Sequence, residues 1–212
     1  MSLQSAALAM SFSSLPFRAP SLLALLGAAL SLASPLAAGE PRPLGNGRDL
    51  TGWKVPAPNP FWKVADGIIT GTNDEARQGS MLWTAQNYGD FECDAEARWE
   101  GEIDSGFMFR QPELQLQIGV SRSLKRDMTG CFYLGSYPEA GQARERAKLI
   151  KPGDWNHFKI RAQGDTFTVW INGTLAVSYQ NPKFAAPGPL GLQIHPGLAM
   201  KVEFRHLSIR EL

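Results

Sequence analysis

Residues 166–177, with the sequence TFTVWINGTLAV, carry the clearest structural signal in this chain of 212 residues. The first half alternates, so that its Phe, Val and Ile side chains share one face of an extended strand. Asn172-Gly173 follows, the dipeptide most typical of a two-residue hairpin turn, because both turn positions need a positive φ. The chain then runs back through a second apolar stretch, and the segment therefore predicts a β-hairpin.

The same alternation recurs along most of the chain, whereas helical periodicity is nearly absent. Apolar runs also flank an Asp66-Gly67 turn, and residues 139–148 suit either a short helix or an exposed loop. Many short strands with Gly, Pro and Asn-Gly turns predict a single all-β domain, a β-sandwich or jelly roll. The further alternating segments are residues 88–99, 103–110, 114–118, 156–161, 190–195 and 201–209.

The composition is that of a globular protein. Hydrophobic residues make up 43% and charged residues 19% of the chain, and the formal net charge is +1. Because there is no excess of basic residues to neutralise phosphates, neither a nucleic acid nor an anionic membrane surface is expected as a partner.

The first 39 residues have the pattern of an export signal. Arg18 is their only charged side chain, an apolar run follows at 22–30, and small residues precede Glu40. The alternative is a membrane anchor, but the run is shorter than the roughly 20 residues that a span needs. We therefore expect a signal peptide at 1–39, a mature domain at 40–212 in the periplasm or outside the cell, and no membrane contact after cleavage.

The two cysteines, Cys93 and Cys131, are expected to be free thiols rather than a disulfide. Alternation places Cys93 on the apolar face of its strand and Cys131 on the face opposite Phe132 and Leu134. If those two residues mark the core, the sulfurs point in different directions and cannot bridge.

Polar side chains alternate with apolar ones on several of the predicted strands. If these strands form one curved sheet, the polar residues gather on its exposed concave face. Amides, an arginine and an aromatic ring there suit a hydroxyl-rich ligand such as a saccharide. The alternative is a solvated outer face with no function. The residues concerned are Arg110, Gln115, Gln117, Tyr133, Gln193 and His195.

His195 is the best candidate for a general base or acid, since its strand ends at Pro196-Gly197 and imidazole titrates near neutral pH. Asp127 follows the strand of the two glutamines and is a candidate catalytic carboxylate. The alternative is a solvated charge, which its loop also suits. Lys151 is a candidate substrate contact near the sheet rim, with the same alternative.

Several motifs in order resemble those of the 3-keto-disaccharide hydrolase family. The resemblance covers nearly all of the mature chain and implies a concanavalin A-like, laminin-G-like jelly roll. The motifs are LGNGRDLTGW at 44–53, WKVADG at 62–67, YGDFE at 88–92, DSGFMFR at 104–110, GDWN at 153–156, NG at 172–173, GLQIH at 191–195 and VEFR at 202–205.

The resemblance also implies cleavage of glycosides that are oxidised at C3. The ketone acidifies the C2 proton, whose removal expels the glycosidic oxygen from C1, and water then adds. This chemistry needs a base, an enolate stabiliser such as Arg110 or a divalent metal, and an acid. His195 and Arg110, with Asp127 or Glu113, are the residues that would supply it.

One position departs from the family pattern. Gln115 stands where the family has Glu, and Val120 lies near its Asp, whereas Gln117 is kept. An amide cannot act as a carboxylate base and is a poor metal ligand. A non-catalytic carbohydrate-binding module is therefore the alternative to an enzyme, and an exported scaffold that binds another protein is a third hypothesis.

Overall fold

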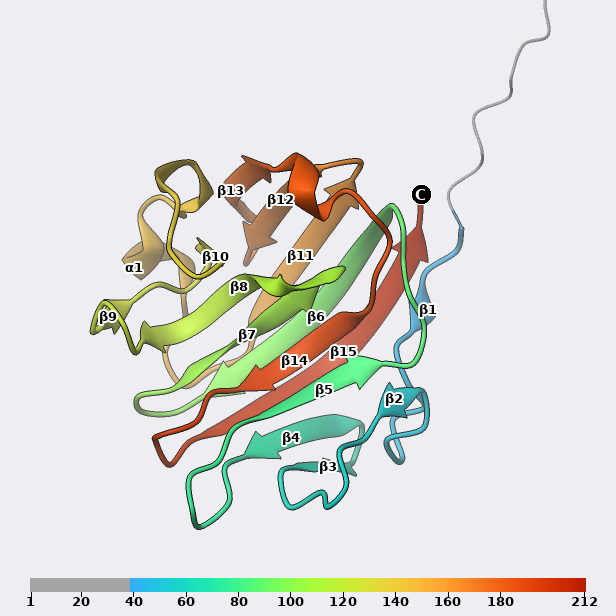
Figure 1. Cartoon of the computed structure of the whole chain (residues 1–212), viewed down its shortest axis with the longest axis vertical. Coiled ribbons are helices and arrows are strands. Elements are labelled where there is room, and N and C mark those ends of the chain that lie inside the picture. Colours follow the sequence, from blue (N-terminus) through green and yellow to red (C-terminus); the bar gives the residue numbers. More distant parts are fainter. Residues whose placement is uncertain (1–38) are drawn as a thin grey trace, which may run out of the picture. The chain divides into compact units, whose positions relative to one another are not determined.

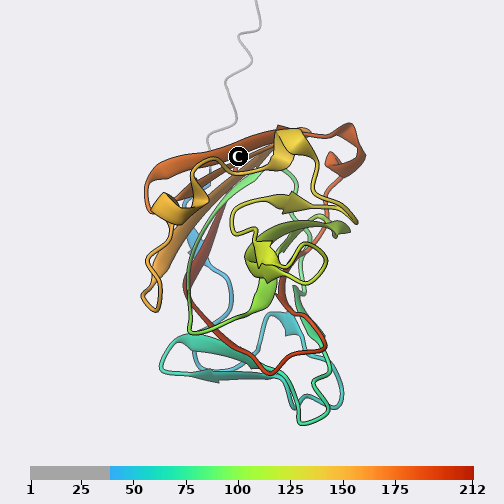
Figure 2. The same cartoon turned by 90° about the vertical axis from the view of Figure 1, so that its left-hand side faces the viewer.

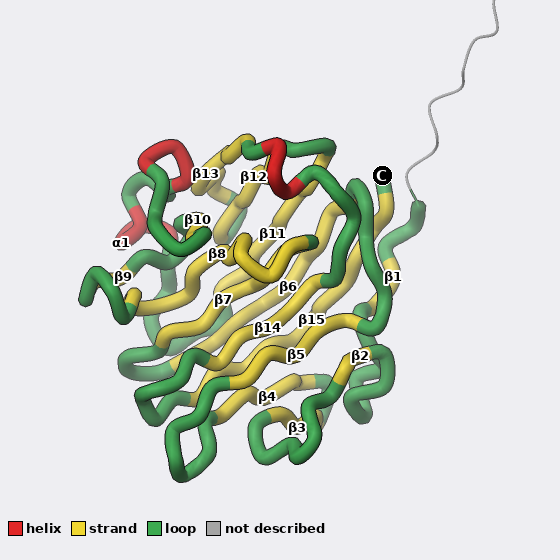
Figure 3. The backbone as a smooth tube through the Cα atoms, viewed as in Figure 1, coloured by secondary structure: helices red, strands yellow, loops and turns green. Residues whose placement is uncertain are grey.

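The computed structural model describes residues 39–212, apart from the side chains of residues 111–113 and 146–147. Residues 1–38 of the predicted leader and the Glu113 side chain therefore lie outside the described part. Strands dominate the described residues (Figure 3). The helical elements are one short α-helix, α1 (Arg146–Leu149), and the 3-10 turns Glu139–Gly141 and Pro182–Phe184. No helix among these residues is long and apolar enough to cross a membrane.

An eight-stranded antiparallel sheet forms one layer, in the order β13-β12-β11-β6-β15-β4-β3, with β1 beside β15 (Figure 1). Its strands are β13 (Thr174–Gln180), β12 (Thr166–Ile171), β11 (Asn156–Gln163), β6 (Phe91–Trp99), β15 (Lys201–Glu211), β4 (Ile68–Thr72), β3 (Trp62–Ala65) and β1 (Arg42–Pro43).

A seven-stranded antiparallel sheet forms the other layer, in the order β10-β8-β7-β14-β5-β2, with β9 paired to β8. The segments from β9 to α1 lie at the left in Figure 1, on the side that faces the viewer in Figure 2. The strands are β10 (Phe132–Tyr133), β8 (Gln111–Ser121), β7 (Asp104–Phe109), β14 (Leu190–Ile194), β5 (Ser80–Thr84), β2 (Trp53–Lys54) and β9 (Arg126–Asp127).

Aromatic side chains join the two layers. Phe107 on β7 packs against Phe158 and Phe204 of the other sheet, with ring centroids 5.4 and 5.6 Å apart. Such buried, tilted ring pairs stabilise a core beyond the area that they bury. The all-β sandwich expected from alternation is therefore confirmed.

The hairpin predicted at 166–177 is confirmed as β12 and β13. Asn172 and Gly173 both have positive φ, 49° and 82°, as a two-residue hairpin turn requires. Phe167, Val169 and Ile171 on β12 are fully buried.

Cys93 and Cys131 are both buried and form no disulfide, as expected. Burial raises the pKa of the Cys93 thiol to about 12. The Cys131 sulfur accepts a hydrogen bond from the Ala143 backbone N–H at 3.3 Å. Both sulfurs therefore belong to the packed interior.

Arg110 does not lie on the polar face, and this expectation is wrong. The pairing of β7 with β8 shifts register between Met108 and Phe109, and Arg110 has a φ of 48°. The irregularity breaks the alternation by which Arg110 would share a face with Gly106, and its side chain is fully buried.

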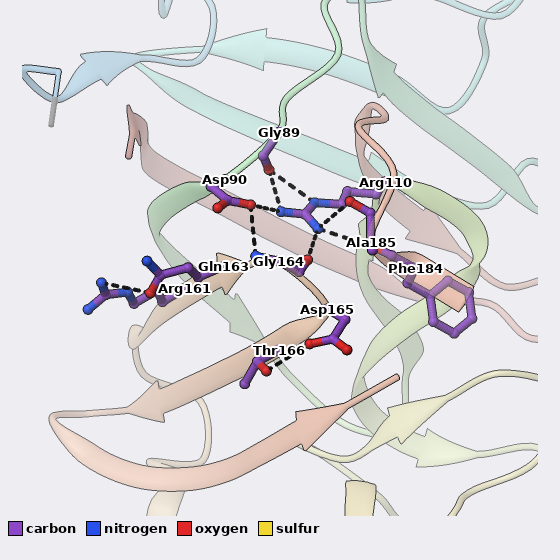
Figure 4. A network of polar contacts seen from close by, with 10 residues as sticks. All are labelled: Gly89, Asp90, Arg110, Arg161, Gln163, Gly164, Asp165, Thr166, Phe184 and Ala185. Atoms are coloured by element: carbon purple, nitrogen blue, oxygen red, sulfur yellow. Dashed lines mark hydrogen bonds and ion pairs between the residues drawn. The ribbon is translucent and has the colours of Figure 1, made fainter. Parts of the chain in front are cut away.

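The Arg110 guanidinium binds the backbone of three separate loops (Figure 4). It donates to the carbonyl oxygens of Gly89 and Gly164, and to those of Phe184 and Ala185 at 3.2 and 3.1 Å. It also pairs with the Asp90 carboxylate at 2.9 Å. Burial lowers the pKa of Arg110, and Asp90 partly opposes this, but a guanidinium stays charged at any ordinary pH.

We expect Arg110→Met to lower the free energy of unfolding by about 3 kcal/mol or more, because it leaves buried carbonyls without donors. Urea unfolding at neutral pH measures the change. Arg126→Met, at an exposed position of β9, is the matched control and is expected to change stability by less than about 0.5 kcal/mol. Equal free energies of unfolding for the two variants would contradict the conclusion that Arg110 stabilises the fold by binding the three loops.

Candidate functional site

A polar pocket of about 200 Å³ lies against β8, β14 and the loops beside them. It brings together five of the six residues expected on the polar face, which confirms their grouping. These are Gln115, Gln117, Tyr133, Gln193 and His195, and the remaining lining residues are Asp104, Ser121, Arg122, Ser123 and Tyr137.

Strand alternation explains how the sequence builds this surface. On β8, Leu114, Leu116 and Ile118 are fully buried in the hydrophobic core, so the intervening glutamines point to the opposite face. Gly106 on the neighbouring strand leaves room for the Gln115 amide, because a Cβ there would lie 2.7 Å from the Gln115 side chain.

The three glutamine amides are hydrogen-bonded to one another. Gln115 Nε2 donates to Gln117 Oε1 at 3.0 Å and to Gln193 Oε1 at 2.8 Å. It also lies 3.0 Å from the Ser105 carbonyl oxygen. Gln115 and Gln117 are buried, so the expectation that the whole polar face is exposed is wrong for these two residues, because their amides bond to one another and to Asp104. Gln193 is half-buried at the pocket surface.

Asp104 holds one end of this amide chain. Its Oδ1 accepts a hydrogen bond from Gln117 Nε2 at 2.9 Å, and its Oδ2 accepts one from the Arg122 backbone N–H at 2.9 Å. Sequence reasoning missed this residue as a site candidate. Its place two residues before Gly106, on the same face of β7, was the signal that could have found it.

Two tyrosines form the aromatic part of the pocket. The Tyr133 and Tyr137 rings lie 4.9 Å apart, and the Tyr137 hydroxyl donates to Gln117 Oε1 at 3.1 Å. Burial raises the pKa of Tyr137 to about 12, so the phenol is protonated at neutral pH. Tyr137 lies in a loop without alternation, and the sequence offered no signal for its role.

His195 is half-buried at the end of β14 and lines the pocket. Its Nδ1 lies 2.7 Å from the Pro196 carbonyl oxygen. A carbonyl only accepts hydrogen bonds, so Nδ1 carries the proton of the neutral ring and Nε2 keeps a basic lone pair. This arrangement suits a general base.

Asp127 and Lys151 lie outside the pocket, and the expectations for their positions are wrong. The exposed Asp127 accepts hydrogen bonds from Thr129 N and Oγ1 at 2.7 and 2.6 Å, and so closes its own turn. Lys151 is exposed before β11, where its backbone bonds the Asn156 side chain. Following the glutamine strand in sequence did not bring Asp127 into the pocket, because its carboxylate is bound within its own turn.

The pocket residues do not fit a divalent metal. Asp104 and His195 are the only Asp, Glu, His or Cys residues that line it, and both Asp104 oxygens already accept hydrogen bonds. The described part of the chain contains no group of three or more such residues.

A larger hollow of about 520 Å³ lies between the N-terminal loop and β15. Its titratable side chains, Asp49 and His206, already have protein partners: Asp49 accepts from Asn46 and Thr51, and His206 contacts Glu96 at 3.0 Å. The remaining lining is mostly apolar or glycine, so the polar pocket is the better candidate for chemistry.

The fold is similar to carbohydrate-active proteins of known structure. A candidate glycosyl hydrolase from Parabacteroides distasonis has a TM-score of 0.64 at 21% identity, covering 82% of this chain and 100% of that chain. A carbohydrate-binding module, CBM66, from Bacillus subtilis has a TM-score of 0.56 at 17% identity, covering 76% and 96%. A β-glucanase from Bacillus licheniformis has a TM-score of 0.53 at 13% identity, covering 84% and 100%.

At these identities the similarity concerns the fold, a jelly roll. No curated protein sequence matches the chain. The family model of the 3-keto-alpha-glucoside-1,2-lyase-like domain matches residues 40–210, nearly the whole of the described sandwich. The ordered motifs, the jelly roll and this match agree, and the chain belongs to the family of 3-keto-α-glucoside-1,2-lyase-like domains.

Proposed function

We propose that this protein cleaves 3-keto-glycosides by elimination across C1 and C2, followed by hydration, and that the polar pocket is its active site. The observation that carries the proposal is the hydrogen bond from His195 to the Pro196 carbonyl, which keeps Nε2 as a base beside neutral amides and phenols. Family membership supports the substrate class.

In the first step His195 Nε2 takes the proton from C2 of the sugar, and the electron pair of that bond forms an enolate whose charge rests on the C3 oxygen. The enolate then collapses, the bond from C1 to the glycosidic oxygen breaks, and the leaving oxygen takes a proton. Water adds across the resulting C1–C2 double bond. The Tyr133 phenol, which lines the pocket, is the group suited to protonating the leaving oxygen, because the Tyr137 hydroxyl already donates its proton to Gln117.

The half-buried Gln193 and His195 side chains at the pocket surface suit sugar oxygens, because an amide and an imidazole both form hydrogen bonds with them. The volume of about 200 Å³ is smaller than the ~300 to 1,000 Å³ typical of drug-sized ligands. We therefore expect recognition of one sugar ring, with the rest of the glycoside outside the pocket.

A non-catalytic carbohydrate-binding protein is the second candidate. The pocket has a single carboxylate, Asp104, which is occupied by two hydrogen bonds, and Gln115 replaces the Glu of the family pattern. Such a pocket binds saccharides without cleaving them if His195 does not reach C2.

Incubation with a 3-keto-glucoside that carries a chromogenic leaving group separates these candidates. We expect release of the chromophore without added metal, and a loss of about 10² to 10⁴-fold in rate for His195→Gln. His157→Gln is the matched control, since that ring contacts Asp94 on another surface at 2.8 Å. Saccharide binding without release would identify a binding protein.

The raised pKa of Tyr137 predicts a pH dependence of stability. The folded protein keeps the phenolic proton to about 12, whereas an unfolded tyrosine loses it near ~10. The resulting stabilisation is complete below pH ~10 and is lost as the pH rises from about 10 to about 12.

Urea unfolding of the wild type and of Tyr137→Phe over this interval measures the effect, because the difference cancels other titrating groups. The advantage of the wild type is expected to shrink as the pH rises. A difference that stays constant would show that Tyr137 titrates normally.

The proposed location is the periplasm or the exterior of the cell, supported by the N-terminal pattern of Arg18, an apolar run and small residues. We expect intact-mass analysis of the full-length protein, expressed in a bacterium with fractionated compartments, to find an exported form that begins near Glu40. Retention of the whole leader in the membrane fraction would identify an anchor instead.

A further inference from the structure

The amide chain in the pocket has a direction, which is set by groups that only accept hydrogen bonds. The Asp104 carboxylate accepts from Gln117 Nε2, so Gln117 must turn its carbonyl oxygen toward Gln115. Gln115 therefore donates from its nitrogen, and the Ser105 carbonyl at 3.0 Å requires the same orientation. Two independent acceptors thus fix the same polarity.

Gln193 is the last amide in this series of hydrogen-bonded glutamines, and it is the one that reaches the pocket surface. Its Oε1 accepts from Gln115 Nε2 at 2.8 Å. Turning the Gln193 amide over would place two N–H groups against each other and lose this bond. Its Nε2 is consequently directed away from Gln115 and has no hydrogen-bond partner among the side chains and backbone groups that the structure describes.

We propose that Gln193 is a fixed N–H donor that selects the ketone oxygen of the bound sugar, and that Asp104 is the residue that positions it through the amide chain. This inference rests on the proposed function of the pocket. A ketone only accepts hydrogen bonds, whereas a hydroxyl donates or accepts. A donor therefore binds both groups, but an acceptor in its place repels the ketone and still binds the alcohol.

The same donor fits the chemistry of the reaction. When C2 loses its proton, negative charge builds up on the C3 oxygen, and a hydrogen bond to that oxygen becomes stronger. A donor whose orientation is fixed before the substrate arrives needs no rearrangement at that moment. Gln193 thus takes the place that Arg110, held in the interior by its carbonyl partners, does not fill.

The test uses 1,5-anhydroglucitol and its 3-keto derivative, which cannot undergo glycosidic cleavage because neither carries a glycosidic oxygen at C1. Calorimetric titration is carried out on wild type and on Gln193→Glu, above the pH range in which Glu is protonated. The variant keeps an acceptor for Gln115 and presents a second acceptor to the pocket. We expect it to bind the ketone at least about tenfold more weakly and the alcohol within about twofold.

Gln78→Glu is the matched control, because it adds the same charge at an exposed position outside the pocket and should change neither affinity. Asp104→Asn is the second variant. It has one acceptor oxygen for the two donors, Gln117 and Arg122. We expect it to weaken the preference for the ketone by a smaller factor, because the Ser105 carbonyl still favours the same orientation of the Gln115 amide.

The inference would be overturned if Gln193→Glu weakened the binding of the ketone and of the alcohol equally. It would also be overturned if the wild type bound the alcohol but not the ketone. The chromogenic assay reports separately on the proposed function. If the wild type cleaves the substrate but Gln193→Glu does not change the preference for the ketone, the inference is refuted and the proposed function stands. If Gln193→Glu lowers that preference but the wild type releases no chromophore, the elimination reaction is refuted and the inference is supported.

Discussion

The buried guanidinium of Arg110 is the constraint on which the end of this sandwich depends. A charge in the protein interior is tolerated only when its donors are satisfied, and here the acceptors are backbone carbonyls from three loops together with Asp90. Those loops precede β6, connect β11 to β12, and follow β13. One side chain thus fixes connections of both sheets, at the point where β7 passes into β8 and on toward the glutamines.

The alternation of side chains predicted the parts of the structure in which the backbone is regular. The β12–β13 hairpin and the grouping of Gln115, Gln117 and Gln193 follow from the period of two and from one Asn-Gly turn. Arg110 escaped the same argument because a register shift and a positive φ intervene between it and Met108. No sequence pattern marks that irregularity.

Loops explain the remaining differences. Tyr137 lies in an irregular segment and contacts Gln117 in the pocket. Asp127 lies outside the pocket, where its carboxylate accepts a hydrogen bond from Thr129 in the same turn. The partner of a polar side chain in a loop depends on tertiary packing. A loop has no regular periodicity in its sequence from which that partner could be predicted. Asp104 was accessible to sequence reasoning in principle, because it begins a strand whose alternation was recognised.

The buried cysteines have a consequence for the conditions under which the chain can fold. Cys93 and Cys131 are not joined, and the high pKa of Cys93 keeps it as an unreactive thiol. The native state therefore contains no covalent cross-link whose formation needs an oxidant or an isomerase. Its stability is indifferent to the redox potential of the surroundings, so the same fold is available in a reducing or an oxidising compartment.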